Sequence, residues 1–263
     1  MQRITSRHNP LVARCRAIVR GEESDLLLLD GAHLIAEAIA AGLRVREVIV
    51  SAVAMDRSEV RHLIELIRHH NIALVSGSAS LMHAISPVRS PSDIVAIADK
   101  PEQQHERLYV PGPPLVVIAV DVQDPGNVGA IARVAEAAGA SGLVAAGNSA
   151  DPFGWKALRG AMGSAFRLPI AVRTQTDDVV TEVRTRGCRI VATAPKGGQS
   201  LFDVDLRGPV AILIGGEGAG LSAGLRSASD INVTIPMTTP VESLNTAVAA
   251  ALLLYEAKRQ RVR

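Results

Sequence analysis

Aromatic residues are scarce in this chain of 263 residues, which contains three Phe, two Tyr and one Trp. Cysteine is also rare: Cys15 and Cys188 lie far apart and at no metal-ligand spacing, which argues against a disulfide framework or a zinc site. Free thiols suit a reducing compartment, so we expect a cytoplasmic protein. The basic start lacks the apolar segment of a signal peptide, and no apolar run is long enough to span a bilayer.

Two common nucleotide-binding signatures are missing as well. No Gly-x-x-x-x-Gly-Lys-Ser/Thr sequence occurs, which excludes a P-loop. The glycine-rich segment 215–220 has its third glycine at the wrong spacing for a dinucleotide fingerprint. The pair His69-His70 has no partner at metal-ligand spacing, and we interpret it as the end of a helix. We therefore expect no metal site.

The abundant residues are small and aliphatic, mainly Ala, Val, Leu and Gly, and 48% of the chain is hydrophobic. Such a composition suits tightly packed α/β layers, and the length suits one large domain or two ordinary ones. The net charge is only +2, but basic residues without acids gather at both ends. This favours an anionic partner, although two solvated helix faces would explain it equally well. These basic residues are Arg3, Arg7, Arg14, Arg16 and Arg20, and Lys258, Arg259, Arg261 and Arg263.

The first half alternates between short apolar segments typical of strands and amphipathic segments typical of helices. This alternation predicts a small α/β domain over residues 1–100. The composition then becomes polar and Pro-rich, so we interpret residues 101–113 as a linker. The predicted strands are 26–29, 45–51, 73–75 and 94–98, and the predicted helices are 32–41, 58–69 and 81–85.

The second half begins with six apolar residues, Leu115–Val120, as expected for a strand buried on both faces. Alternation then continues, which predicts an open, mostly parallel sheet with helices on both sides over residues 114–263. Ligands bind such sheets at the carboxyl ends of the strands. The further predicted strands are 143–146, 169–172, 189–194, 210–214 and 231–235, and the predicted helices are 127–138, 156–165, 177–186 and 243–259.

Two polar residues mark the helix predicted after the first of these strands. Asn127 opens the helix and could serve simply as its N-cap. Arg133 lies six residues further on among alanines and a valine, where a guanidinium is costly unless it finds an anion. The alternative, an Arg whose stem packs while its head reaches solvent, stays open at this stage.

Polar residues also follow two later strands. The segment 215–220 lets a backbone approach a ligand closely and puts Glu217 at the bend, although on its own it could be an ordinary turn. Ser243 and Asn245 begin the last predicted helix, and the simplest interpretation makes Ser243 the N-cap and puts Asn245 in the first turn. Two nearby prolines indicate a shaped loop.

Segment 151–166 contains three of the aromatic residues next to several cations. Interleaved rings and cations are typical of proteins that bind unpaired RNA bases. A helix with an aromatic anchor in the core is the alternative. The cations concerned are Lys156, Arg159 and Arg167.

Taken together, three of these segments resemble the three sequence motifs of the SpoU/TrmH family of RNA ribose 2′-O-methyltransferases. The matching residues are 127–133, 214–221, and 235–237 with 243–245. Each match is modest alone, but three in order at family-like spacing are specific, and the resemblance extends over 113–263. More loosely, segments 4–12 and 29–34 resemble the family's N-terminal substrate-binding domain, which is similar to L7Ae-type RNA-binding proteins.

The resemblance implies a fold and a set of partners. It implies a deep trefoil knot in the second domain that binds S-adenosylmethionine, a homodimer formed through that domain, and an RNA substrate-binding domain over residues 1–100. The cofactor-binding residues implied are Ala194, Gly215, Gly216, Ile235, Met237 and Leu244. The RNA-binding residues expected are Arg3, Arg7, Arg14, Arg16 and Arg159.

The resemblance also implies catalytic roles. Arg133 would deprotonate the ribose 2′-hydroxyl or stabilise the oxygen as its charge develops. Because arginine stays protonated in proteins, we favour electrostatic stabilisation, and the assignment of a base stays open. Asn127, Glu217, Ser243 and Asn245 would position the ribose, a phosphate and Arg133.

We therefore predict S-adenosylmethionine-dependent methylation of a ribose 2′-hydroxyl in RNA, with ribosomal RNA the first choice and transfer RNA the second. One alternative is a non-catalytic RNA-binding or ribosome-assembly protein on the same fold, which would not need the combined set of polar site residues. Another is a small-molecule enzyme on a Rossmann-like sheet, which the missing nucleotide signatures disfavour.

Overall fold

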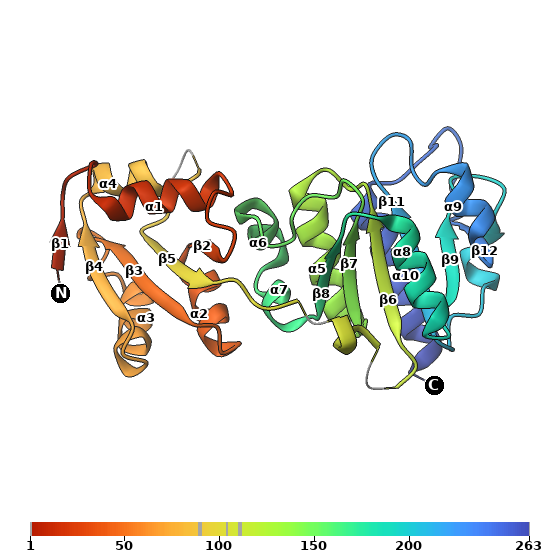
Figure 1. Cartoon of the computed structure of the whole chain (residues 1–263), viewed down its shortest axis with the longest axis horizontal. Helices are drawn as coiled ribbons and strands as arrows, with labels where there is room; N and C mark the ends of the chain where they lie inside the picture. The colour runs from red at the N-terminus through yellow and green to blue at the C-terminus, as the bar shows by residue number, and fades with distance from the viewer. Residues whose placement is uncertain (1, 89–90, 104, 110–111, 263) are drawn as a thin grey trace. The chain divides into compact units, whose positions relative to one another are not determined.

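The computed structural model describes residues 2–88, 91–103, 105–109 and 112–262. The chain divides into two compact units, the first formed by Met1–Glu102 with Phe153–Phe166 and the second by Gln103–Pro152 with Arg167–Arg263. The polypeptide therefore passes between the units three times. Each unit has its own sheet and its own hydrophobic core (Figure 1).

The first unit is built on a five-stranded mixed sheet in the order β1-β4-β3-β5-β2 (Figure 1). β1 and β3 pair in parallel with β4, whereas β5 is antiparallel to both β2 and β3. The strands are β1 Gln2–Ile4, β2 Leu26–Asp30, β3 Val45–Ser51, β4 Ala73–Gly77 and β5 Ile94–Asp99. The helices are α1 Pro10–Val19, α2 Ala32–Ala40, α3 Ser58–His69, α4 Ala79–Ile85 and α6 Trp155–Ala161.

The predicted strand 45–51 and helix 58–69 are confirmed at their predicted bounds. α3 buries four apolar side chains at helical spacing, which is the pattern that made it recognisable. β1 and α1 were not predicted from the sequence. α1 begins with a strong start signal, because Asn9 accepts a hydrogen bond from the N–H of Leu11 and Pro10 occupies the first helical position.

The second unit is built on a seven-stranded sheet in the order β10-β12-β9-β11-β6-β7-β8, in which every pairing is parallel. The strands are β6 Leu115–Val120, β7 Gly142–Ala146, β8 Ile170–Arg173, β9 Arg189–Thr193, β10 Gln199–Ser200, β11 Val210–Gly215 and β12 Ile231–Thr234. The helices are α5 Pro125–Ala138, α8 Thr176–Thr185, α9 Ala223–Ala228 and α10 Thr246–Arg261, with 3-10 turns η1 His105–Tyr109 and η2 Leu201–Asp203. A short helix, α7 Ser164–Arg167, begins in the first unit and ends at the first residue of the second unit's last segment.

The strand order reverses between β6 and β11, which lie next to each other in the sheet. β6 leads through α5 to β7 on one side, whereas β11 leads through α9 to β12 on the other. Ligands bind open α/β sheets at such a switch point, in the crevice beyond the carboxyl ends of the strands. The expected mostly parallel sheet is confirmed, and its switch point coincides with two of the predicted motifs.

α5 and α10 pack side by side and run in the same direction. Their beginnings are joined by a hydrogen bond of 3.1 Å from Asn245 Nδ2 to Asn127 Oδ1. Near their ends, Lys258 Nζ donates to the carbonyl of Ala137 at 2.7 Å. Both helices therefore begin at the carboxyl edge of the sheet, where the switch point lies.

Two predicted helices differ from the structure. The predicted helix 156–165 is two short helices, α6 and α7, because Met162 ends α6 in a left-handed conformation with φ of 51°. The last helix begins at Thr246 rather than at residue 243. Within segment 101–113, η1 buries Leu108 and Tyr109 in the core of the second unit. Among the described residues, no helix is long and apolar enough to cross a membrane.

Candidate active site

Three side chains predicted for the site meet at the carboxyl edge of the second sheet. Asn127 lies in the first turn of α5, Glu217 follows β11, and Asn245 precedes α10. Asn127 Nδ2 donates to Glu217 Oε1, and Asn127 Oδ1 accepts from Asn245 Nδ2 at 3.1 Å. Residues 90 and 118 positions apart in the sequence thus form one hydrogen-bonded chain from a carboxylate to a helix start.

The two asparagines have other local roles than those predicted. Asp124, not Asn127, caps α5, because its Oδ1 accepts from the N–H of Gly126 at 2.6 Å. Asn245, not Ser243, caps α10, because its Oδ1 accepts from the N–H groups of Ala247 and Val248 at 2.9 and 3.2 Å. With its Oδ1 held by the helix N–H groups, Asn245 directs its N–H₂ group to Asn127. The Asp-Pro pair at 124–125 is the sequence signal for the start of this helix.

Arg133 lies on the exposed side of α5. Within the part of the chain that the structure describes, its guanidinium has no hydrogen-bond or ion-pair partner. The neighbouring Glu136 is engaged instead by Arg167, with N–O distances of 2.6 and 3.0 Å. Of the alternatives considered for Arg133, the structure has the head group in solvent, where an external anion can reach it.

Ser243 is exposed in the irregular segment between β12 and α10. Among the described residues its side chain makes no hydrogen bond, so it does not join the chain formed by Asn127, Glu217 and Asn245. It precedes Asn245 by two positions and therefore lies close to the start of α10.

The residues predicted for cofactor binding gather where three adjacent strands, β9, β11 and β12, end. Ala194 is held by β12, since its N–H donates to the carbonyl of Val233 at 2.8 Å. Met237 and Leu244 belong to the irregular segment that follows. Within the described residues their backbone N–H groups have no partner, which leaves donors for a ligand at this edge. The residues predicted here are Ala194, Gly215, Gly216, Ile235, Met237 and Leu244.

The predicted RNA-binding arginines lie in the first unit. Arg3 is in β1, Arg7 precedes α1, and Arg14 and Arg16 are on α1. Arg16 Nε donates to the carbonyl of Ala84 at 2.9 Å, and the others make no hydrogen bond or ion pair with a described residue. Burial raises the pKa of the nearby carboxylate of Glu47, and the charge of Arg14 favours a lower pKa there.

Arg159, on α6, is in a different situation. Its Nη1 lies 3.1 Å from Oδ2 of Asp30, whose side chain is only 1% exposed. Within segment 151–166, Phe153 is buried, as the core-anchor interpretation predicts, with Lys100 Nζ 5.2 Å from its ring centre. Lys156 Nζ lies 5.4 Å from the ring centre of Trp155.

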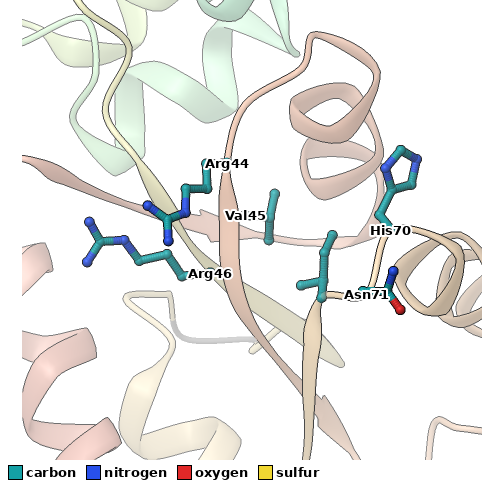
Figure 2. A pocket seen from close by; sticks show the side chains of 6 residues that line it. Arg44, Val45, Arg46, His70 and Asn71 are labelled. Carbon is teal, nitrogen blue, oxygen red and sulfur yellow. The ribbon is translucent and has the colours of Figure 1, made fainter.

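A surface hollow of about 590 Å³ in the first unit was not predicted. It lies where β3 and β4 begin, with Arg44 and Arg46 on one side and His70 and Asn71 on the other (Figure 2). Both arginines pair with the single carboxylate of Asp99, which neutralises part of their charge. The hollow contains none of the predicted site residues.

Neither cysteine is placed to act as a thiolate. Burial raises the pKa of Cys15 to about 12, helped by the nearby carboxylate of Glu47. Burial also raises the pKa of Cys188, so both thiols stay protonated near neutral pH. The described residues include no cluster of His, Cys, Asp and Glu that could hold a metal ion.

A parallel α/β sheet with polar groups converging on its switch point defines the second unit as a ligand-binding α/β domain. The sequence profile of the SpoU rRNA Methylase family matches residues 114–255, and the profile described as Thiostrepton-resistance methylase, N terminus, matches residues 1–108. The chain belongs to the SpoU rRNA methylase family.

Curated relatives match over nearly the whole chain. RlmP of Bacillus subtilis, a 23S rRNA (guanosine(2553)-2'-O)-methyltransferase, is 32% identical over 97% of this chain and 98% of its own. A 23S rRNA (uridine(2479)-2'-O)-methyltransferase of Streptomyces viridochromogenes is 36% identical over 89% of this chain and 83% of its own.

Solved structures agree. An RNA 2'-O ribose methyltransferase superposes with a TM-score of 0.86 at 32% identity over 100% of both chains. The SpoU methyltransferase AviRb from Streptomyces viridochromogenes, crystallised in complex with AdoMet, superposes with a TM-score of 0.85 at 31% identity over 97% of this chain and 99% of its own. The predicted family and the predicted α/β class with a parallel-sheet second domain are thereby confirmed, and the trefoil knot stays a prediction.

Asn245→Asp should separate helix capping from site positioning. Aspartate caps helices as well as asparagine, so the free energy of unfolding should change by less than about 0.5 kcal/mol. The carboxylate cannot donate to Asn127, however, and it adds a second negative charge near Glu217. We therefore expect kcat for methyl transfer to fall by at least about tenfold. Steady-state kinetics measure kcat, and urea unfolding measures the stability. An unchanged kcat would show that Asn245 only caps the helix.

Proposed function

We propose that this protein transfers the methyl group of S-adenosylmethionine to a ribose 2′-hydroxyl of ribosomal RNA. The observation that carries the proposal is the chain Glu217–Asn127–Asn245 at the sheet switch point, with the unpaired Arg133 on the same helix as Asn127. The relatives named above are 23S rRNA 2′-O-methyltransferases, which gives the substrate class.

S-adenosylmethionine, when bound, supplies a methyl group on a positively charged sulfur that is already a good electrophile. The protein must therefore mainly align the 2′-oxygen and stabilise its developing charge. Arg133 carries that stabilisation, because a guanidinium stays protonated and donates to an oxyanion. Asn127, Glu217, Ser243 and Asn245 position the ribose, a phosphate and Arg133.

The donor binds at the ends of β9, β11 and β12. The N–H groups of Met237 and Leu244 are available to it. Gly215 and Gly216 lie beside it, where their missing Cβ atoms let the backbone pack against Gly220 and Asp121. Ala194 and Ile235 complete this set. The segments after β11 and β12 form the trefoil knot that the family resemblance implies. An experimental structure with bound S-adenosylmethionine would test both the knot and the donor site.

The two relatives modify different nucleosides, one a guanosine and the other a uridine. The site proposed here therefore handles the ribose, which both nucleosides share, and the base is selected elsewhere. Residues 1–100 provide RNA binding, residues 101–113 link the domains, and residues 114–263 carry the methyl transfer. A ribosomal RNA substrate implies a cytoplasmic reaction.

Arg3, Arg7, Arg14, Arg16 and Arg159 are the RNA-binding residues proposed. Arg7 and Arg14 test the role most cleanly because neither makes a hydrogen bond or ion pair with a described residue, and the charge of Arg14 acts only at longer range on Glu47. The double variant Arg7→Ala/Arg14→Ala should weaken RNA binding by about tenfold at 0.15 M salt and flatten the salt dependence. Its S-adenosylmethionine affinity should be unchanged. Filter binding at several salt concentrations measures the effect, and an unaltered salt slope would contradict it.

The protein is proposed to be a homodimer through α10. Val248, Leu252 and Tyr255 are 48%, 43% and 51% exposed and recur at helical spacing, while the opposite face of α10 is buried. A helix on a monomer surface normally presents polar residues outward, so two apolar faces indicate a second packing partner. Another copy of the chain fits, since α10 lies beside α5 and would bring Arg133 near the subunit boundary.

Leu252→Arg should therefore convert the dimer to a monomer, because it puts a charge into an apolar interface. Sedimentation equilibrium measures the outcome. Val53→Arg, at an exposed apolar position of the first unit, is the matched control and should leave the mass unchanged. This interface would be excluded if the unmodified protein were a monomer. It would also be excluded if Leu252→Arg formed a dimer with the same dissociation constant as the unmodified protein.

The activity itself is tested with labelled S-adenosylmethionine and unmodified ribosomal and transfer RNA, followed by mass spectrometry of the nucleosides. A 2′-O-methylated nucleoside from ribosomal RNA is expected. A methylated base would contradict the ribose chemistry. Binding of RNA without methyl transfer or donor binding would instead identify a non-catalytic RNA-binding protein.

A further inference from the structure

The residue that follows β6 has a backbone conformation that residues with side chains rarely adopt. Asp121 has φ of 54°, in the left-handed region. The residue is exposed, so burial of its side chain does not explain the conformation. Backbone strain of this kind persists only where surrounding contacts hold it, and it concentrates at functional sites. The contacts of Asp121 therefore indicate its purpose.

One set of contacts comes from the loop that follows β7. Asp121 Oδ1 accepts hydrogen bonds from the backbone N–H of Asn148 at 2.8 Å and from Nδ2 of the same residue at 3.3 Å. Ser149 Oγ accepts from the N–H of Val122 at 3.0 Å. Gly147 makes this approach possible, because a Cβ at that position would overlap Asp121 Oδ1. The turn after β6 is thus fastened to the turn after β7.

On its other side, Asp121 meets the loop that follows β11. Gly216 N–H donates to the carbonyl of Val120 at 2.8 Å, and a Cβ on Gly216 would overlap the carbonyl oxygen of Asp121. The peptide of Asp121 is therefore the surface against which Gly216 packs. Gly216 leads directly to Glu217, whose carboxylate accepts from Asn127. Any change in the backbone of Asp121 would move Gly216 and Glu217 with it.

We propose that Asp121 is a positioning residue for the methyl donor, which holds the loop beginning at Gly216 in its binding conformation. The inference rests on the proposed function, since it takes Gly215 and Gly216 as part of the donor site. Asp121 acts through the backbone of Gly216. Its carboxylate has the separate task of fastening the left-handed residue to Asn148.

The test measures S-adenosylmethionine affinity by calorimetry in Asp121→Asn and Asp121→Ala. Asparagine tolerates the left-handed region and keeps an acceptor for Asn148, so its dissociation constant should stay within about twofold of the original. Alanine loses both properties, and its dissociation constant should rise about tenfold, equal to about 1.4 kcal/mol. KM for the donor should rise in parallel, with kcat reduced less.

Asn71→Ala is the matched control, because Asn71 also has φ of 54° but lies in the first unit. It imposes the same backbone strain on alanine and should leave donor affinity unchanged. Asp121→Ala with an affinity within about twofold of the original would overturn the proposal. Should Asp121→Ala fail to fold, Asp121→Gly decides. Glycine can adopt the left-handed conformation but cannot bond Asn148, so the turn is no longer held in that conformation and donor affinity should fall. An unchanged affinity of Asp121→Gly would also overturn the proposal.

Hydrogen exchange of the unmodified protein, with and without S-adenosylmethionine, separates this proposal from the location of the site. Protection of residues 215–222 and 235–245 by the donor is expected. If the donor does not protect these residues, the proposed donor site is wrong. If it protects them but Asp121→Ala binds the donor with unchanged affinity, only the proposed role of Asp121 is wrong.

Discussion

Arg133→Ala is expected to reduce kcat for methyl transfer by about 10²–10³-fold while leaving S-adenosylmethionine affinity unchanged. The magnitude is that typical of removing one donor that stabilises a developing oxyanion. The 2′-oxygen gains negative charge as its proton leaves for the attack on the methyl group, and the ground-state hydroxyl does not carry that charge. An interaction that strengthens only in the transition state affects kcat rather than binding.

The structural setting of Arg133 makes this test clean. The side chain is exposed and has no partner among the described residues, and alanine is the best helix former. The free energy of unfolding should therefore stay the same or rise slightly. Single-turnover kinetics and calorimetry with the donor measure the two effects separately.

Two further variants sharpen the interpretation. Arg133→Lys keeps a charge but not the planar fork of donors, so it should recover only part of the rate. Arg207→Ala removes an exposed arginine from the same unit, just before β11 and thus near the opposite edge of the sheet, and should leave kcat unchanged. Near-normal turnover of Arg133→Ala would show that another group stabilises the oxygen.

Arg159→Ala is expected to destabilise the first unit by about 3 kcal/mol, the lower end of the range for breaking a buried ion pair. Asp30 is almost fully buried, and its Oδ1 has no hydrogen-bond partner among the described residues. Without Arg159, Asp30 would be a buried charge without compensation. The guanidinium of Arg159 is about half exposed, so in the variant water can partly take its place beside Asp30, which limits the loss of stability.

Urea unfolding measures the effect, and Arg20→Ala is the control in the same unit. Arg20 and Glu22 form an ion pair at 2.6 Å, but both side chains are more than half exposed. Such surface pairs contribute about 0–1 kcal/mol, so this control should change little. Arg159→Ala/Asp30→Asn should regain part of the stability, since it removes the uncompensated charge.

The outcome also bears on RNA binding. If Arg159→Ala lowers RNA affinity without loss of stability, Arg159 contacts RNA as the sequence analysis expected. If Arg159→Ala lowers stability and the added Asp30→Asn change partly restores it, Arg159 is a structural residue. It would then be supplied to the first unit by a segment that lies 129 positions from Asp30 in the sequence.

The sequence by itself determined the class of the second domain. The unbroken apolar segment 115–120 required a strand buried on both faces, and the alternation after it required a parallel sheet. The motif spacing determined the family, and with it Asn127, Glu217 and Asn245 as members of one site. These features are local or periodic, so they can be recognised in the order of the residues.

The tertiary structure decided what depends on neighbours in space. The helix caps are Asp124 rather than the predicted Asn127, and Asn245 rather than the predicted Ser243. The reason is that side-chain geometry determines which oxygen reaches the first N–H groups of a helix. The partner of Arg159 could not be predicted, since Asp30 becomes its neighbour only when a segment from the second half packs on the first unit. The left-handed Asp121 was equally hidden, because its conformation depends on loops from two other strands that the sheet brings to one edge.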